Sequence, residues 1–128
     1  MPGFAELLKS YRGASGLSQR ALARAAKINP AIVNRLESGD RVPSSPEQVR
    51  ALARALDLDA DQSDRLLGAA GYWPDAFQSL GPVDRTLLRV ARLLANPQIA
   101  EADQARFRQV IDLLVDQWLG LGQPGKEG

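Results

Sequence analysis

Hydrophobic positions recur at helical spacing along most of the chain. Residues at i, i+3, i+4 and i+7 lie on one face of an α-helix. The first such stripe is formed by Phe4, Leu7, Leu8 and Tyr11. No segment alternates β-branched and polar residues as a half-buried strand would, and alanine, leucine and arginine favour helix. The pattern predicts an all-α protein with seven helical segments.

Capping residues predict where four of these helices begin. Serine, asparagine and aspartate side chains accept hydrogen bonds from the free N–H groups of a first turn. A proline at the first helical position or a glutamine at the third strengthens the prediction. The expected N-caps are Ser18, Asn29, Ser45 and Asp59. Glycine is favoured just after a helix, and the expected helix ends are Gly13 with Gly16, Gly39 and Gly71.

The pattern predicts two helical units joined by a connector. Residues 1–71 contain five short helices, and residues 72–81, which include Tyr72-Trp73-Pro74, are expected to form the connector. Residues 82–121 contain two longer amphipathic helices. The glycine-rich tail at 122–128 is expected to fray.

Composition argues against several classes of function. Cysteine and histidine are both absent, which excludes disulfides and thiolate metal sites and removes the commonest general acid/base. We therefore expect no metal, no cofactor and no enzyme activity. The first residues lack the basic and apolar regions of a signal peptide, and no apolar run approaches the ~20 residues of a membrane span. A cytoplasmic protein without a membrane partner is expected.

Charge is distributed unevenly although the net charge is only +1. Residues 1–56 hold nine Lys and Arg against four Asp and Glu, a net charge of +5, and the remainder carries −4. A basic front half and an acidic rear half indicate that the front faces a polyanion.

The residues from Gln19 to Leu36 have the spacing of a helix-turn-helix. Leu22 and Ala26 precede a turn at residues 26–28, and apolar residues after it complete a small core. The third helix of the chain, which is the second helix of this motif, then presents an outer face to solvent. This face offers Pro30, Ala31, Asn34 and Arg35. Asparagine can bond adenine bidentately and arginine can bond guanine, so these residues are candidates for reading bases in duplex DNA.

The chain resembles a known family over roughly residues 4–71. The similar segments are Leu17-Ser18-Gln19, Leu22-Ala23, the run Asn29 to Gly39 and Leu52-Ala53-Arg54-Ala55-Leu56. They resemble the Xre family, regulators related to the phage Cro and repressor proteins. The resemblance implies a five-helix domain whose third helix reads bases, with an ion pair joining Arg12 to Glu37. It also implies that Gln19 contacts a phosphate or the first base.

Two departures from the family affect the expected contacts. Lys27 stands at a turn position that is glycine in many members, and a positive φ there would cost about 1 kcal/mol. Pro30 and Ala31 cannot form side-chain hydrogen bonds, so direct readout rests mostly on Asn34 and Arg35. The expected phosphate-contacting residues are Ser18, Gln19, Arg20, Lys27, Asn29 and Arg41.

Apolar residues in the last helix recur at steps of four and three. This seam consists of Phe107, Ile111, Leu114, Trp118 and Leu121, with Val110 and Leu113 on a flank. One stripe can pack on the preceding helix, whereas the other needs either the front domain or a second chain. We favour a homodimer, because operators commonly have twofold symmetry. The expected dimerisation residues are Phe107, Val110, Ile111, Leu114 and Trp118.

These observations predict a sequence-specific DNA-binding transcriptional regulator that acts as a repressor. The alternative is an antitoxin or protein-interaction adaptor built on the same domain. An enzyme is a distant third, since no phosphate loop and no metal-ligand spacing is present. No sequence feature marks a small-molecule effector or names the operator.

Overall fold

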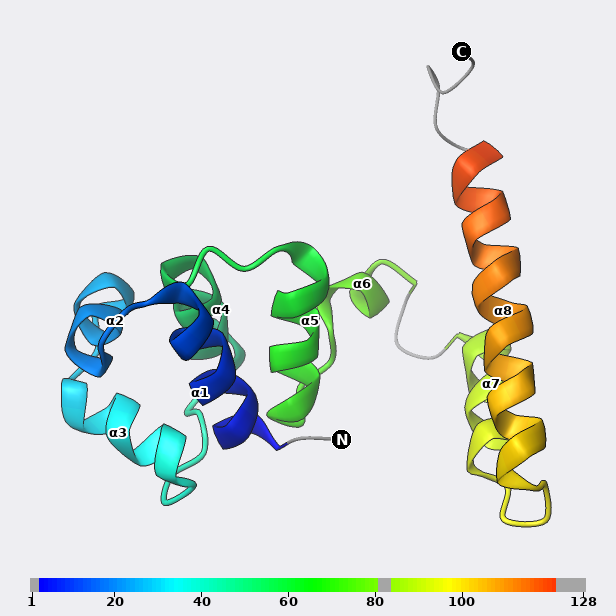
Figure 1. Cartoon of the computed structure of the whole chain (residues 1–128), viewed down its shortest axis with the longest axis horizontal. Helices are drawn as coiled ribbons and strands as arrows, with labels where there is room; N and C mark the ends of the chain where they lie inside the picture. Colours follow the sequence, from blue (N-terminus) through cyan, green and yellow to red (C-terminus); the bar gives the residue numbers. More distant parts are fainter. Residues whose placement is uncertain (1–2, 81–83, 122–128) are drawn as a thin grey trace. The chain divides into compact units, whose positions relative to one another are not determined.

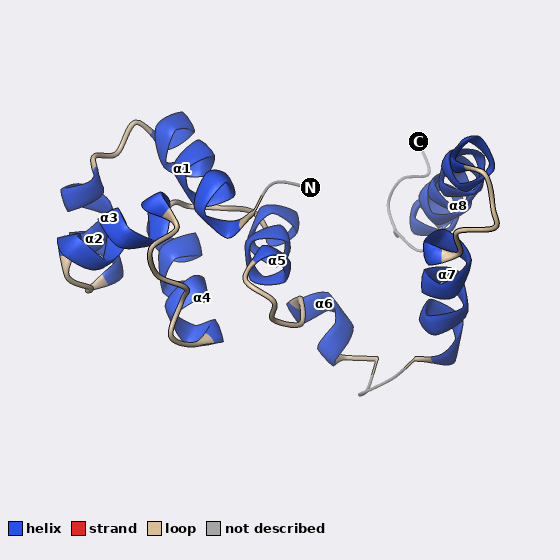
Figure 2. Ribbon diagram, turned by 90° about the horizontal axis from the view of Figure 1, so that it is seen from below, coloured by secondary structure: helices blue, strands red, loops and turns tan. Residues whose placement is uncertain are grey.

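The computed structural model describes residues 3–80 and 84–121. Every regular element within those residues is a helix, so the all-α prediction is confirmed (Figure 1 and, with helices in blue, Figure 2). Contacts divide the chain into two compact units, residues 1–82 and 83–128. Each unit is described by itself below.

The described residues form eight helices. The first unit contains α1 (Phe4–Ser15), α2 (Gln19–Ala26), α3 (Pro30–Ser38), α4 (Pro46–Ala55), α5 (Ala60–Ala69) and α6 (Asp75–Gln78). The second contains α7 (Arg85–Ala95) and α8 (Glu101–Leu121). Seven of these correspond to expected segments, and the four-residue α6 is additional.

All four expected N-caps are confirmed. Ser18 Oγ accepts from the N–H of Ala21, and Asn29 Oδ1 accepts from the N–H of Ala31. Ser45 and Asp59 accept in the same way at the starts of α4 and α5. Asp59 and its third-position glutamine also form a complete capping box. Local side-chain chemistry therefore fixes where these four helices begin.

The sequence predicts that Gly13 and Gly16 both end the first helix, and this prediction is wrong for Gly13. Gly13 lies inside α1, which continues to Ser15, and Gly16 forms the cap with a φ of 77°. A glycine within a helix costs only about 0.5–1 kcal/mol, so Gly13 weakens the helix without ending it. Gly39 and Gly71 have positive φ, as expected of residues that follow a helix.

The core of the first unit is made by one apolar stripe from each of α1 to α5. Its largest fully buried side chains are Leu8, Leu22, Leu36, Leu52, Leu66, Leu67, Val33 and Val49. α2 packs against both α3 and α4, and the small Ala23 is completely buried on α2. α1 packs against α3 and α5 and closes the other side (Figure 1). This packing holds α3 rigidly, with one face inward and one outward.

The segment expected to be a connector includes α6, which is bonded to the first unit. Arg50 on α4 donates to both carboxylate oxygens of Asp75, at 2.8 and 3.4 Å. This hydrogen bonding lowers the pKa of Asp75 from its ordinary value. Asp64 on α5 accepts from the N–H groups of Asp75 and Ala76 and so caps α6. Tertiary contacts rather than hydrophobic periodicity therefore form this helix.

The second unit is a helical hairpin of unequal arms. Asp84 caps α7, and Gln104 donates to the backbone oxygens of Asn96 and Ile99 to hold the loop. With 11 and 21 residues, α7 and α8 are about 16 and 32 Å long, so α8 extends beyond α7 (Figure 1). None of this unit's described hydrophobic side chains is buried. No helix among the described residues has the length and apolar character of a membrane span.

Candidate nucleic-acid interface

A tight turn sets α3 across α2. Lys27 has a φ of 59°, a left-handed conformation in which its N–H bonds to the end of α2. The N–H of Ile28 donates to the carbonyl oxygen of Ala23 at 2.9 Å, and Asn29 then caps α3. A non-glycine residue in this conformation costs about 1–2 kcal/mol. Lys27 thus adopts the positive φ for which many family members use glycine, and its side chain is exposed.

The inner and outer faces of α3 divide as the spacing predicts. Val33 and Leu36 are fully buried against the core, which also includes Leu22 from α2. The four residues proposed to read bases are all exposed on the other side; they are Pro30, Ala31, Asn34 and Arg35. Their outward placement makes them available to a partner, and base reading itself stays a prediction.

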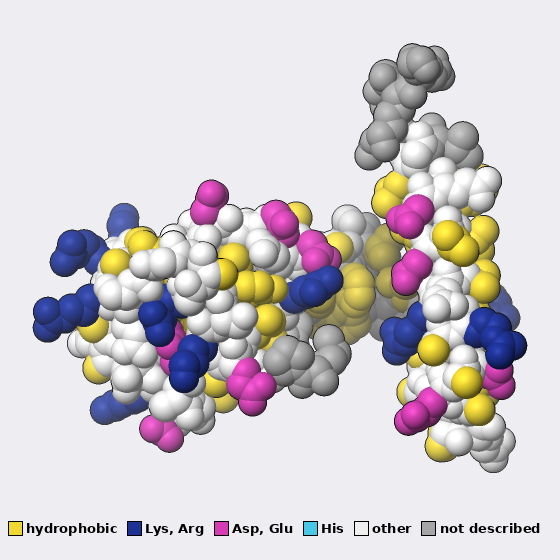
Figure 3. Space-filling view, in the orientation of Figure 1, with side chains coloured by type: hydrophobic (Ala, Val, Ile, Leu, Met, Phe, Trp, Pro, Cys, Tyr) yellow, Lys and Arg dark blue, Asp and Glu magenta, His cyan; other side chains and the backbone are white. Residues whose placement is uncertain are grey.

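The surface of α2 and α3 is strongly basic. Residues 18–36 contain four Lys and Arg and no Asp or Glu. The four cations, Arg20, Arg24, Lys27 and Arg35, are exposed, and none forms an ion pair with a described residue. Figure 3 shows Lys and Arg side chains gathered over this end of the first unit. We call these four residues the basic face.

Arg24 belongs to this surface although the sequence analysis did not select it. Arg20 and Arg24 lie one turn apart on α2 and, with Ile28 and Pro30, line a shallow pocket of about 310 Å³. The signal was present in the sequence, because basic residues at i and i+4 share a helix face. An anion seated there would meet both guanidinium groups.

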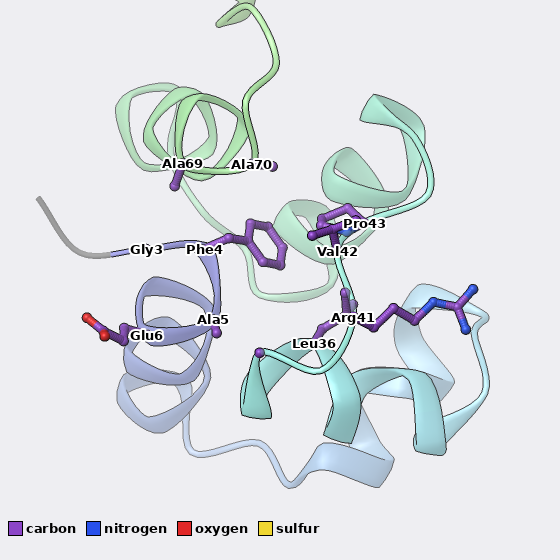
Figure 4. A pocket seen from close by; sticks show the side chains of 11 residues that line it. Gly3, Phe4, Ala5, Glu6, Leu36, Arg41, Val42, Pro43, Ala69 and Ala70 are labelled. Carbon is purple, nitrogen blue, oxygen red and sulfur yellow. The ribbon is translucent and has the colours of Figure 1, made fainter.

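Arg41 lies outside the basic face. It follows α3 in the loop that borders a pocket of about 270 Å³, where the ring of Phe4 faces Val42 (Figure 4). The Arg41 side chain extends away from that pocket toward solvent. It forms no ion pair with a described residue, so its charge is available to a partner.

Ser18 and Asn29, two further expected phosphate contacts, act as helix caps. Each uses its side-chain oxygen to accept a backbone N–H bond, and both side chains are exposed. The serine hydroxyl hydrogen and the asparagine amide group can still donate to a phosphate oxygen. Their contact with a phosphate stays a prediction.

Arg12 and Glu37 form the ion pair that the resemblance implies. Arg12 Nε and Nη2 donate to the two carboxylate oxygens at 2.5 and 3.0 Å, and Nη1 donates to the carbonyl oxygen of Leu17. The Glu37 side chain is only 3% exposed and that of Arg12 is 20% exposed. The hydrogen bond with Glu37 raises the pKa of Arg12 above its ordinary value. The pair joins α1 to α3.

Two amide side chains extend this pair to the surface of α3. Gln19 Nε2 donates to Glu37 Oε1 at 3.2 Å. Asn34 Nδ2 in turn donates to Gln19 Oε1 at 3.2 Å. We call Arg12, Glu37, Gln19 and Asn34 the polar relay. The resemblance implies the Arg12–Glu37 pair, whereas no pattern in the sequence predicts the bonds of Gln19 to Glu37 and Asn34, because they join positions 18 and 15 residues apart.

The comparison with known families fits this geometry. Residues 4–66 match the family model of a helix-turn-helix domain. No curated protein and no solved structure matches the chain significantly. The matched range contains α1 to α3 and the turn at Lys27. Residues 4–66 therefore have the fold of a helix-turn-helix domain.

The proposed dimerisation residues divide into two groups on α8. Phe107 and Ile111 are half-buried, and Phe107 borders a pocket with Val90 and Leu93 of α7. Val110, Leu114 and Trp118 are exposed, and Trp118 is 69% exposed. The seam is thus partly covered within the chain, by α7. Leu113, Val115 and Leu119, which lie to either side of the seam, are exposed as well, while the side chain of Leu121 lies outside the described residues.

Arg12→Ala should destabilise the helix-turn-helix domain by about 3–5 kcal/mol, because it leaves the buried Glu37 carboxylate without its cation. Urea denaturation followed by circular dichroism measures the change. Arg65→Ala is the matched control: its pair with Asp61 is largely exposed, and such pairs contribute about 0–1 kcal/mol. Equal denaturation midpoints for the two variants would contradict the structural role of the buried pair.

Proposed function

We propose that the protein is a sequence-specific transcriptional regulator of the Xre type that represses by binding duplex DNA. The observation that carries this proposal is the basic face on a helix-turn-helix domain, with no exposed carboxylate between residues 18 and 36. Four exposed cations on α2, α3 and the turn between them, none paired with a described residue, suit the phosphates that border a major groove. The repressor role rests on the resemblance to Cro and phage repressors.

Base reading is proposed for the exposed side of α3. Asn34 can bond adenine and Arg35 can bond guanine, each through two hydrogen bonds. Pro30 and Ala31 offer only apolar contact, which suits a thymine methyl group. Phosphate contacts are proposed for Ser18, Gln19, Arg20, Lys27, Asn29 and Arg41, and the structure adds Arg24 to these candidates.

A homodimer through the second unit is proposed to bring two such domains to one operator. Its support is that no hydrophobic side chain described between residues 84 and 120 is buried, although both helices carry large apolar ones. The exposed part of the α8 seam lies on the portion that extends beyond α7. Burying a leucine or valine side chain contributes about 1.5–3 kcal/mol, so packing this surface against the same surface of a second chain would stabilise a dimer. A twofold dimer can engage half-sites about 34 Å apart.

The same exposed apolar surface favours one alternative. A different protein, rather than a second copy, could cover Leu114 and Trp118, which would make the chain an adaptor or antitoxin. The basic face would then be secondary or unused. A purified chain that binds no duplex and captures no second copy of itself would favour this alternative.

Selection from random duplex DNA tests the proposed function directly. Arg35→Ala should weaken the selected site by about 1–3 kcal/mol and relax the preference at one base pair. Lys27→Ala should instead weaken all duplexes alike and reduce the salt dependence. If the two variants lose affinity for the selected site and for random duplexes to the same extent, Arg35 contacts only phosphate. If no sequence is selected, sequence-specific binding is contradicted.

A further inference from the structure

The buried carboxylate of Glu37 decides which end of each amide in the polar relay donates and which end accepts. A carboxylate paired with a guanidinium offers only acceptors, so the Gln19 amide must turn its NH2 group toward Glu37. The Gln19 carbonyl oxygen then faces the opposite way. That oxygen can only accept, so Asn34 must turn its own NH2 group toward Gln19. The orientation of both amides follows from the charge of Glu37.

The outer end of the relay is the candidate base-reading residue. Asn34 is exposed on α3, whereas Glu37, one turn further along the same helix, is buried. With one Nδ2 hydrogen bonded to Gln19, Asn34 keeps a second hydrogen and its Oδ1 lone pairs unbonded to described residues. These are the donor and acceptor that recognise N7 and N6 of adenine. Their order along the groove depends on which way the amide faces.

We infer that Glu37 is a positioning residue for DNA recognition, which acts through Gln19 to fix the orientation of the Asn34 amide. This inference rests on the proposed function. It identifies Glu37 and Gln19 as the residues that determine the base preference at the pair contacted by Asn34. Glu37 does not touch DNA in this arrangement. A buried charge instead limits a flexible surface amide to one of its two orientations before DNA arrives.

Two variants disrupt the relay at different links. Glu37→Gln replaces an acceptor-only group by an amide that can face Gln19 with either its oxygen or its nitrogen. Gln19→Met breaks the link to Asn34 but leaves the Arg12–Glu37 pair in place, so this variant keeps the buried ion pair intact. Asp40→Asn is the matched control, because it removes one negative charge just after α3 outside the relay.

The first measurement is base discrimination by the full chain on duplex DNA. The base pair that depends on Asn34 is identified from the profile of Asn34→Ala, and a bidentate contact discriminates there by about 5- to 100-fold. Glu37→Gln and Gln19→Met should lose most of this discrimination and keep that at the Arg35-dependent base pair. In an Asn34→Ala background neither should change the profile further. Asp40→Asn should match the parent chain.

The second measurement needs no DNA. The two Nδ2 hydrogens of Asn34 give separate NMR signals because rotation about the amide C–N bond is slow. The hydrogen bond to Gln19 shifts the signal of the bonded hydrogen, so both relay variants should move this signal while Asp40→Asn does not. A parent chain that binds no duplex would overturn the proposed function and the reading role with it. A parent chain that binds, together with relay variants that keep full discrimination at the Asn34 base pair, would overturn the inference alone.

Discussion

The affinity of the full chain for its selected duplex should fall by about 10³–10⁵ between 50 and 200 mM salt. Each subunit presents the four cations of the basic face together with Arg41, so a dimer can neutralise roughly 6–10 phosphates. Each neutralised phosphate releases a counterion, which is the origin of the steep slope. Fluorescence anisotropy with a labelled duplex, repeated across this salt range, measures it.

A control for this experiment lies on another helix of the same domain. Arg65 on α5 is exposed and paired with Asp61, away from the basic face. Arg65→Gln should leave the salt slope unchanged, whereas Arg24→Gln should reduce it. A binding curve that does not respond to salt would contradict a phosphate-contacting surface.

Leu114→Asp should convert the full chain from dimer to monomer and lower its affinity for a two-half-site operator by about 10²–10⁴. Leu114 lies on the exposed part of the α8 seam, where a carboxylate would be desolvated against a second copy. Linked half-sites bind more tightly because the second contact is intramolecular, and a monomer loses that advantage. Sedimentation velocity measures the mass of the protein in solution, and fluorescence anisotropy measures its affinity for the labelled operator.

Gln109→Asp gives the matched control for the dimer. It introduces the same charge on α8, at an exposed position on the side of the helix where Asp112 and Asp116 lie. This variant should remain dimeric and bind as the parent does. A parent chain that is monomeric at tens of micromolar would contradict the proposed dimer, as would a Leu114→Asp chain that still sediments as a dimer.

The features best predicted from sequence are those set by neighbouring residues. Ser18, Asn29, Ser45 and Asp59 cap their helices as expected, because a cap depends on a few consecutive positions. The inward and outward sides of α3 follow from helical periodicity in the same way. Gly13 shows the limit of such rules, since a helix-breaking residue does not break a helix that tertiary packing holds.

The features that sequence did not predict depend on contacts across the fold. α6 forms because Arg50 and Asp64, from two other helices, bond to its first residues. Periodicity places Phe107 and Trp118 on one seam of α8 but cannot tell which of them α7 covers, since that depends on helix lengths. The bonds of Gln19 to Glu37 and to Asn34 join residues that no short pattern relates, whereas the Arg12–Glu37 pair follows from the family resemblance.

None of the described hydrophobic side chains of the second unit is buried, which has a consequence for the response to protein abundance. In the proposed dimer, association supplies the interior that a single hairpin does not have, so ordering this unit and pairing two chains form one equilibrium. While most chains are unpaired, the dimer concentration grows with the square of the chain concentration. Operator occupancy would then rise more steeply than the rate of synthesis. The cell's supply of the regulator would itself act as an input signal, without any small-molecule effector.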